Sequence, residues 1–239
     1  MRLDALAIGA HPDDVELGCG GTLALLVEKG YRVGILHLTS GERGTRGTVE
    51  ERREEARHAG EILGAAAVEL LDFGDGALRR GEAEEDALIE VFRRLRPELV
   101  LCAAPSDRHP DHGRAHRLVV DVAYYAGLRR RGEGEPHRPG LVAAYMQHDP
   151  FVPDFIVDVT AVWERKLAAL AAYASQLHTP ERQREEPETK VSSREFRNAI
   201  EARARHYGLL VGGEFGEPFV TGKPLRVTDP VAHVLPGPR

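Results

Sequence analysis

The stretch DALAIGAHPDDVE, residues 4–16, places a short apolar run directly before a cluster of polar side chains. Further short apolar runs follow along the first half of the chain, and longer amphipathic stretches separate them. This alternation is typical of βαβ units around a parallel sheet. We therefore predict strands at residues 4–10, 32–38, 67–72 and 99–103, with helices between them.

Helix boundaries are visible at two places in this half of the chain. Thr48 followed by Glu51 forms a capping-box pattern at a helix start. A second helix is expected between Gly20 and Gly30, because a glycine commonly ends a helix.

The second half carries weaker signals. Strands are predicted at residues 141–146 and 155–159, followed by a long helix over 161–176. Residues 129–140 and 178–193 are charged and contain Gly or Pro, which predicts exposed loops, and the tail from Gly212 onward is predicted to be extended. With no linker between parts, residues 1–239 are predicted to form one domain. The predicted fold class is α/β and Rossmann-like, a three-layer sandwich with a mostly parallel sheet of order 3-2-1-4-5 and helices on both faces.

Composition narrows the function classes. The chain has 239 residues, 42% of them hydrophobic, which suffices for a sizeable core, and its net charge of -6 is spread along the chain. No basic face is evident, so nucleic acid is not an expected partner. The two cysteines cannot form a disulfide framework, and neither a signal peptide nor a membrane-spanning run is apparent. We expect a cytoplasmic protein without membrane association.

Two polar clusters occupy equivalent places in the predicted sheet. Residues 11–16 follow the first strand, and residues 107–112 follow the fourth. In a sheet of order 3-2-1-4-5 these strands are neighbours, and their helices leave on opposite faces, which opens a crevice at their carboxyl ends. The two clusters are therefore expected to meet.

If the two clusters met without a cation between them, several carboxylates would be crowded into one crevice. Two imidazoles and one carboxylate with an open position form a common catalytic zinc arrangement, in which bound water loses a proton near neutral pH. We predict His11, Asp14 and His112 as the ligands of Zn²⁺. The same donors would also accept Fe²⁺, Mn²⁺ or Co²⁺. Asp13 then remains free for proton transfer.

Other interpretations exist for each cluster. The first could be a polar turn that caps a helix, and the second, with His109 and His112, an ordinary surface loop. Residues 18–21 could open a dinucleotide-binding helix, but acidic side chains precede them and the spacing differs from Gly-x-Gly-x-x-Gly. A tight turn and close helix packing explain these glycines better.

The His-Pro-Asp-Asp-x-Glu motif at residues 11–16 and the His-Pro-Asp-His motif at residues 109–112 resemble those of the LmbE-like, or PIG-L, family of zinc de-N-acetylases. The resemblance implies that His11, Asp14 and His112 hold the metal and that Asp13 is the general base. It also implies that His109, oriented by Asp111, stabilises the oxyanion; a carboxylate would raise its pKa and keep it cationic. Glu16 would support the motif loop or serve as a helix-start carboxylate.

Three segments look similar to the bacillithiol-biosynthesis branch of this family: residues 47–55, 153–159 and 173–176. The branch implies N-acetylglucosaminyl-malate as substrate, with Arg52 and Arg108 as candidates for its carboxylates. The family also implies a homo-oligomer, commonly a hexamer, with the 129–140 and 178–193 loops as candidate contacts. The loop over residues 41–47 is expected to cover the crevice.

The main hypothesis is therefore an enzyme that hydrolyses the acetamide of an N-acetylglucosamine glycoside, a small-molecule substrate. One alternative keeps the chemistry and changes the substrate, for example to diacetylchitobiose. A second is a metal- or sugar-binding protein of the same fold without catalysis, against which the intact Asp13 and His109 argue. A third is a nucleotide-binding Rossmann protein.

Overall fold

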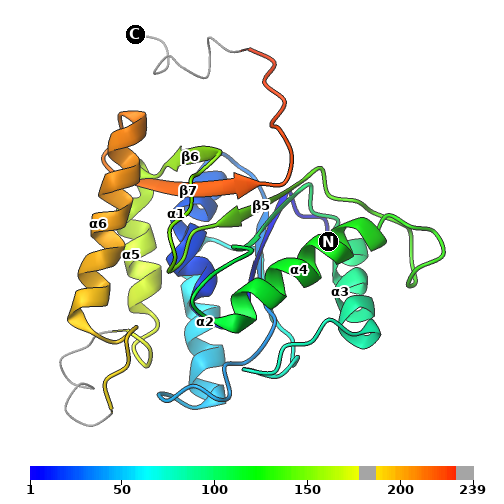
Figure 1. Ribbon diagram of the computed structural model, residues 1–239, viewed down its shortest axis with the longest axis horizontal. Helices are drawn as coiled ribbons and strands as arrows, with labels where there is room; N and C mark the ends of the chain where they lie inside the picture. Colours follow the sequence, from blue (N-terminus) through cyan, green and yellow to red (C-terminus); the bar gives the residue numbers. More distant parts are fainter. Residues whose placement is uncertain (178–186, 230–239) are drawn as a thin grey trace.

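A computed structural model describes residues 1–177 and 187–229. Its strands form one sheet in the order β3-β2-β1-β4-β5-β7-β6. Figure 1 shows β5, β7 and β6 at one end of this sheet. The five strands from β3 to β5 are parallel, as predicted, and β7 runs antiparallel to both β5 and β6. The strand bounds are β1 Ala5–Gly9, β2 Val33–His37, β3 Ala67–Leu70, β4 Leu99–Ala103, β5 Leu141–Tyr145, β6 Phe155–Asp158 and β7 Gly216–Thr221.

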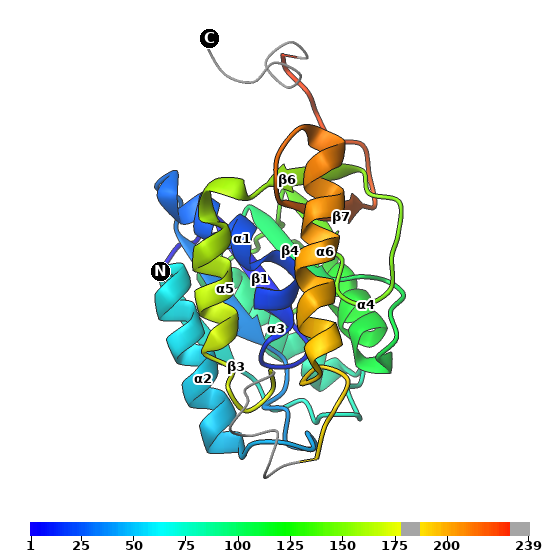
Figure 2. The ribbon, with the colours of Figure 1, turned by 90° about the vertical axis from the view of Figure 1, so that its left-hand side faces the viewer.

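Helices cover both faces of the sheet, which confirms the predicted layers. On one face lie α1 (Asp14–Glu28), α2 (Val49–Leu63), α5 (Trp163–Ala171) and α6 (Arg194–Val211), which Figure 2 shows in front of the strands. On the other lie α3 (Glu82–Leu95) and α4 (Pro110–Tyr125). A short 3-10 helix, η1 (Thr160–Val162), precedes α5.

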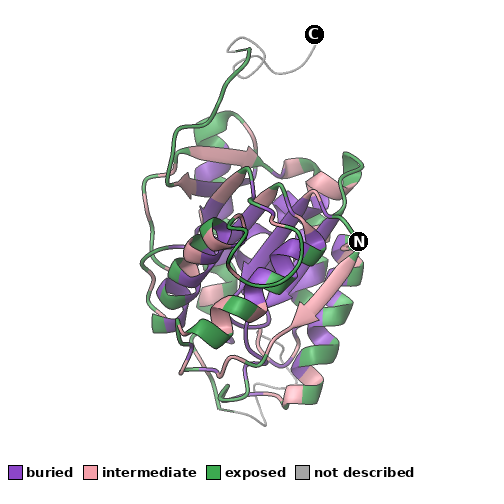
Figure 3. Ribbon diagram, turned by 90° about the vertical axis from the view of Figure 1, so that its right-hand side faces the viewer, coloured by how far each residue is buried: buried purple, intermediate pink, exposed green. Residues whose placement is uncertain are grey.

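Side chains along the strands alternate between the two cores. In β1, Ala5 and Ala7 pack toward α1, α2 and α5, whereas Leu6 and Ile8 pack toward α3 and α4. Parallel strands covered on both faces are apolar throughout, which explains why their sequence signal is continuous. Figure 3 shows the central strands buried and the edge strands β3 and β6 only partly so.

Helix α1 begins at Asp14, earlier than the predicted boundary at Gly20. It kinks at Cys19, and the N–H groups of Gly21 and Thr22 that the kink frees donate to the carboxylate of Glu217 at 2.9 and 2.7 Å. Lys166 pairs with the same carboxylate at 2.5 Å. A side chain from β7 thus caps the second half of α1, so no local pattern could reveal that the helix spans both parts.

The helix predicted over residues 161–176 was wrong in its extent, because α5 ends at Ala171. The backbone N–H and hydroxyl of Ser175 donate to the buried carboxylate of Glu55 on α2, at 2.7 and 2.6 Å. These bonds replace those that a continuing helix would make. Helix α6 was not predicted; it starts at the cap residue Ser193, and Gly212 in the left-handed region ends it.

The loop predictions hold where they can be followed. Residues 129–140 contain no helix or strand, and neither do residues 187–193. Residues 178–186 of the second predicted loop and residues 230–239 of the tail lie outside the described residues. Within the described ranges, no helix combines the length and apolar character that crossing a bilayer requires.

Candidate active site

The first motif forms the turn between β1 and α1. Asp13 adopts a φ of 99°, a left-handed conformation that is unusual for a residue other than glycine. The N–H of His11 donates to Asp14 Oδ2 at 2.8 Å, which closes the turn. This turn places Asp13 and Asp14 along the wall of a crevice of about 200 Å³ at the carboxyl ends of β1 and β4.

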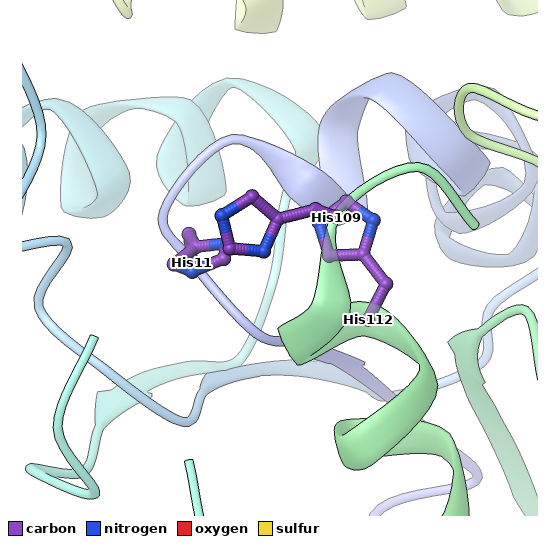
Figure 4. Close-up of side chains that lie close together, drawn as sticks. All are labelled: His11, His109 and His112. Carbon is purple, nitrogen blue, oxygen red and sulfur yellow. The ribbon is translucent and has the colours of Figure 1, made fainter. Parts of the chain in front are cut away.

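The second motif begins helix α4. His109 caps the helix, its Nδ1 accepting a hydrogen bond from the N–H of Asp111 at 3.2 Å, and His112 lies in the first turn. The ring of His109 is 4.7 Å from that of His11 and 5.2 Å from that of His112, measured between centroids. Figure 4 shows these three imidazoles gathered from the two motifs. The two motifs therefore lie together at this crevice, as expected.

Asp14 lies between the two predicted histidine ligands. Its Oδ2 is 3.5 Å from His11 Nδ1, and its Oδ1 is 3.4 Å from His112 Nε2. One ring nitrogen each of His11, His109 and His112 also lie within 4.8 Å of one another. A second group of potential ligand atoms, on His11, Asp75 and Asp111, meets the same distance.

The donor set fits a divalent cation. Nε2 of His11 is buried and makes no hydrogen bond of ordinary geometry among the described residues, although Asp75 Oδ1 is 3.1 Å away. Nδ1 of His112 lies 2.8 Å from Asp107 Oδ2, which leaves Nε2 facing Asp14. Imidazole nitrogens and carboxylate oxygens, with a carboxylate behind a histidine, are the usual surroundings of zinc and similar metals.

Neighbouring carboxylates raise the pKa values of both predicted histidine ligands. Burial alone would lower the pKa of His112, but the carboxylates of Asp14 and Asp107 raise it to about 9. The pKa of His11 is also raised. Burial alone would lower it, but the carboxylates of Asp111, Asp14 and Asp75 outweigh the effect of burial. A bound metal would replace these protons.

The pKa of Asp13 moves in the direction that proton transfer needs. Burial, helped by the charge of Asp14, raises it to about 7. The neighbouring Asp14 has its pKa lowered, since His112 and His11 more than offset its burial. Two adjacent carboxyl groups therefore differ in their readiness to hold a proton, which suits one as a ligand and the other as a base.

Asp111 does not occupy the predicted place beside His109. Its carboxylate accepts hydrogen bonds from the N–H of Gly76 at 2.7 Å and from Arg114 at 2.8 Å. The pKa of His109 is lowered, because burial and the charges of His11 and His112 outweigh the attraction of Asp111. The expectation that Asp111 raises the pKa of His109 is therefore wrong, and the role of His109 at the oxyanion stays a prediction.

The predicted substrate arginines have different surroundings. Arg52 is buried, and its guanidinium donates to the carbonyls of Gly41 at 2.8 Å and Pro12 at 3.0 Å, so it ties the loop after β2 to the first motif. Arg108 is exposed at the rim of the crevice, with Arg43. Glu16 is fully buried, and burial raises its pKa to about 8.

Several site residues were missed by sequence reasoning. Asp107 holds His112, and it also accepts the N–H of Asp149 at 3.1 Å. Gln147 donates to Asp14 Oδ1, and the ring of His148 stacks on that of His112 at 5.6 Å. Gln147 and His148 follow β5, whose carboxyl end lies at the same edge of the sheet as the two motifs. Their position after this strand was the feature of the sequence that could have identified them as site residues.

Comparison with known proteins agrees with this site. Residues 6–123 match the family model described as PIG-L, GlcNAc-PI de-N-acetylase. Diacetylchitobiose deacetylase of Thermococcus kodakarensis is 32% identical over 96% of this chain and 87% of its own length. The 4-oxalmesaconate hydratase of Pseudomonas putida is 35% identical over 73% of this chain and 74% of its own.

A probable N-acetyl-alpha-D-glucosaminyl L-malate deacetylase of Bacillus cereus is 27% identical over 74% of this chain and 84% of its own length. Among solved structures, a conserved protein of Thermus thermophilus superposes with a TM-score of 0.87 at 38% identity, covering all of both chains. The motifs, the sheet order and these similarities together establish that this chain belongs to the PIG-L family of de-N-acetylases.

Proposed function

We propose that this N-deacetylase hydrolyses the acetamide of an N-acetylglucosamine glycoside, using a divalent cation, Zn²⁺ in the simplest case, held by His11, Asp14 and His112. The observation that carries the proposal is the buried carboxyl of Asp13 beside the imidazole cluster, lining the same crevice. A simple binding site needs no free base at this position.

The bound cation would supply a Lewis acid that polarises the amide carbonyl and makes water more acidic. Asp13 accepts the proton of the attacking water and returns it to the departing amine. Its pKa of about 7 without metal lies close to physiological pH, where a group can perform both transfers.

His109 supports the oxyanion as a neutral donor. Because Nδ1 accepts from the N–H of Asp111, the proton of the neutral ring resides on Nε2. Nε2–H can then donate to the carbonyl oxygen as negative charge develops there, without a positive charge on the ring.

The relatives leave the glycosidic partner of the amino sugar open between malate and a second sugar. The similarity to 4-oxalmesaconate hydratase suggests a different reaction. A site that activates water for hydrolysis can also activate it for addition to a carbon–carbon double bond. On the family resemblance we also propose a hexamer acting in the cytoplasm.

The test is acetate release by zinc-loaded protein from N-acetylglucosaminyl-malate and diacetylchitobiose, with hydration of 4-oxalmesaconate measured in parallel. The variant Asp13→Asn should lose about 10²-fold or more of its turnover, the range of general-base catalysis, and keep its bound zinc. Asp72→Asn, an exposed carboxylate after β3, is the matched control. Hydration without acetate release, or no acetate at any metal loading, would contradict the proposal.

A further inference from the structure

Gln147 is a buried polar residue of the crevice that belongs to neither motif. It follows β5, which pairs with β4 as far as Tyr145, so it lies at the same edge of the sheet as the two motifs. The residue lines the crevice and is 1% exposed. Its backbone carbonyl accepts a hydrogen bond from the guanidinium of Arg203 on α6. Gln147 is therefore enclosed and held at its main chain.

The contact with Asp14 determines which way the side-chain amide of Gln147 points. An ionised carboxylate can only accept hydrogen bonds, so the group that faces Oδ1 of Asp14 must be the NH2 group, Nε2. The oxygen of the amide, Oε1, is then the atom left for another partner. It is buried and accepts no hydrogen bond from the residues that the structure describes.

Oε1 of Gln147 differs from the other unpartnered atoms of the crevice. Among the described residues that line it, the buried side-chain atoms without a hydrogen bond are Nε2 of His11, Nε of Arg52, Nδ1 of His148 and Oε1 of Gln147. The last is the one oxygen in this set. A buried carbonyl oxygen without a donor is unfavourable, and only a group that carries N–H or O–H can satisfy it.

The proposed substrate carries such a group beside the bond that is cleaved, because the nitrogen of an acetamide bears one hydrogen. The carboxylates of the crevice have other partners. Oδ2 of Asp75 accepts the N–H of Arg43 at 3.0 Å, and its Oδ1 lies 3.1 Å from Nε2 of His11. Asp14 and Asp13 are the proposed ligand and base. Since Nε2 and Oε1 belong to one amide, Oε1 lies beside Asp14 and so beside the proposed metal position.

We infer that Oε1 of Gln147 accepts the N–H of the scissile amide and that this contact makes the site selective for amides over esters. This role rests on the proposed function and deepens it, because it restricts the substrates to amides whose nitrogen bears a hydrogen. In an ester an oxygen takes the place of the N–H, and its lone pairs would face Oε1. A site built to accept an N–H discriminates against an analogue that lacks it.

The experiment compares kcat/KM for two substrates that both release acetate. One is the glycoside that the zinc-loaded wild type hydrolyses, N-acetylglucosaminyl-malate or diacetylchitobiose, and the other is its counterpart with oxygen in place of the amide nitrogen. In Gln147→Met the ratio of amide to ester should fall by about tenfold, the size of a hydrogen bond left unmade. Gln147→Glu restores an oxygen acceptor, and its ratio should equal or exceed that of the wild type.

A metal measurement separates this contact from the bond between Gln147 and Asp14. Gln147→Met should also weaken zinc binding about tenfold or more in competition with a chelator, and that change lowers the rate on both substrates alike. Asp107→Asn, which alters the partner of His112, is the matched control: it should lower both rates by one factor and leave the ratio unchanged. Gln147→Ala replaces Gln147→Met if the latter does not fold, with the same fall in the ratio expected.

An equal loss on amide and ester in Gln147→Met would mean that Gln147 acts only through Asp14, and would overturn the inference. A ratio in Gln147→Glu as low as in Gln147→Met would overturn it as well, because an acceptor oxygen would then make no difference. Both results leave the proposed function intact. Absence of acetate from both amides in the wild type would remove the proposed function itself, and the role of Gln147 with it.

Discussion

Replacing Glu16 by Gln in the metal-free protein should make stability less dependent on pH. Both carboxylate oxygens of Glu16 are buried without a hydrogen bond of ordinary geometry among the described residues, and burial raises its pKa from 4.5 to about 8. The folded protein therefore keeps this proton at neutral pH, whereas the unfolded chain has lost it. Glutamine has nearly the same shape and does not titrate.

The sign and size follow from proton linkage. A raised pKa in the folded state means that the stability associated with Glu16 is complete below pH 4.5 and is lost as pH rises toward 8. One proton of difference corresponds to about 1.4 kcal/mol per pH unit, so the unfolding free energy of the wild type should fall relative to the variant by about 3 kcal/mol between pH 5.5 and 7.5.

The assay is urea unfolding of both proteins at these two pH values in the presence of EDTA, followed by circular dichroism. Glu28→Gln, an exposed residue on the same helix, is the matched control and should follow the wild type. Equal pH dependence in the wild type and Glu16→Gln would contradict this prediction, because it would mean that Glu16 is ionised when buried.

Three further predictions concern the metal and the packing beneath it. Asp107→Asn should weaken zinc binding about 10- to 100-fold in competition with a chelator, since an amide can donate to Nδ1 of His112 and shift the ring proton to Nε2; unchanged affinity would argue against this role. Zinc affinity of the wild type should rise with pH from 7 to about 9, where the proton on His112 is lost, and titration calorimetry at several pH values would detect a flat profile if this is incorrect. Gly18→Ala should lower the unfolding free energy by about 1–3 kcal/mol, because a Cβ there would meet the ring of Tyr145; a thermal midpoint equal to that of the wild type would exclude the clash.

The sheet was predictable because its signal is local. Apolar runs such as residues 5–9 mark buried strands, and the crossover rule orders them, so the two motifs could be expected at one crevice. The same rule places residues 147–149 at that edge, although they carry no motif of their own.

Other features depend on partners far away in the sequence. Glu217 caps the second half of α1 by accepting from Thr22, which is 195 residues away in the sequence. Glu55 accepts from Ser175, 120 residues away, just after the end of α5. The carboxylate of Asp111 bonds to Gly76 instead of His109, a choice that depends on where the loop after β3 lies. Periodicity and spacing contain no information on such contacts.

In the proposed site, His11, Asp14 and His112 share one cation beside the free carboxyl of Asp13. Anomalous X-ray scattering at the zinc edge, from crystals of the zinc-loaded protein, tests it directly. We expect a peak within bonding distance of these three side chains, with Asp13 uncoordinated. A peak held instead by His11, Asp75 and Asp111, whose atoms also lie within 4.8 Å of one another, would contradict it.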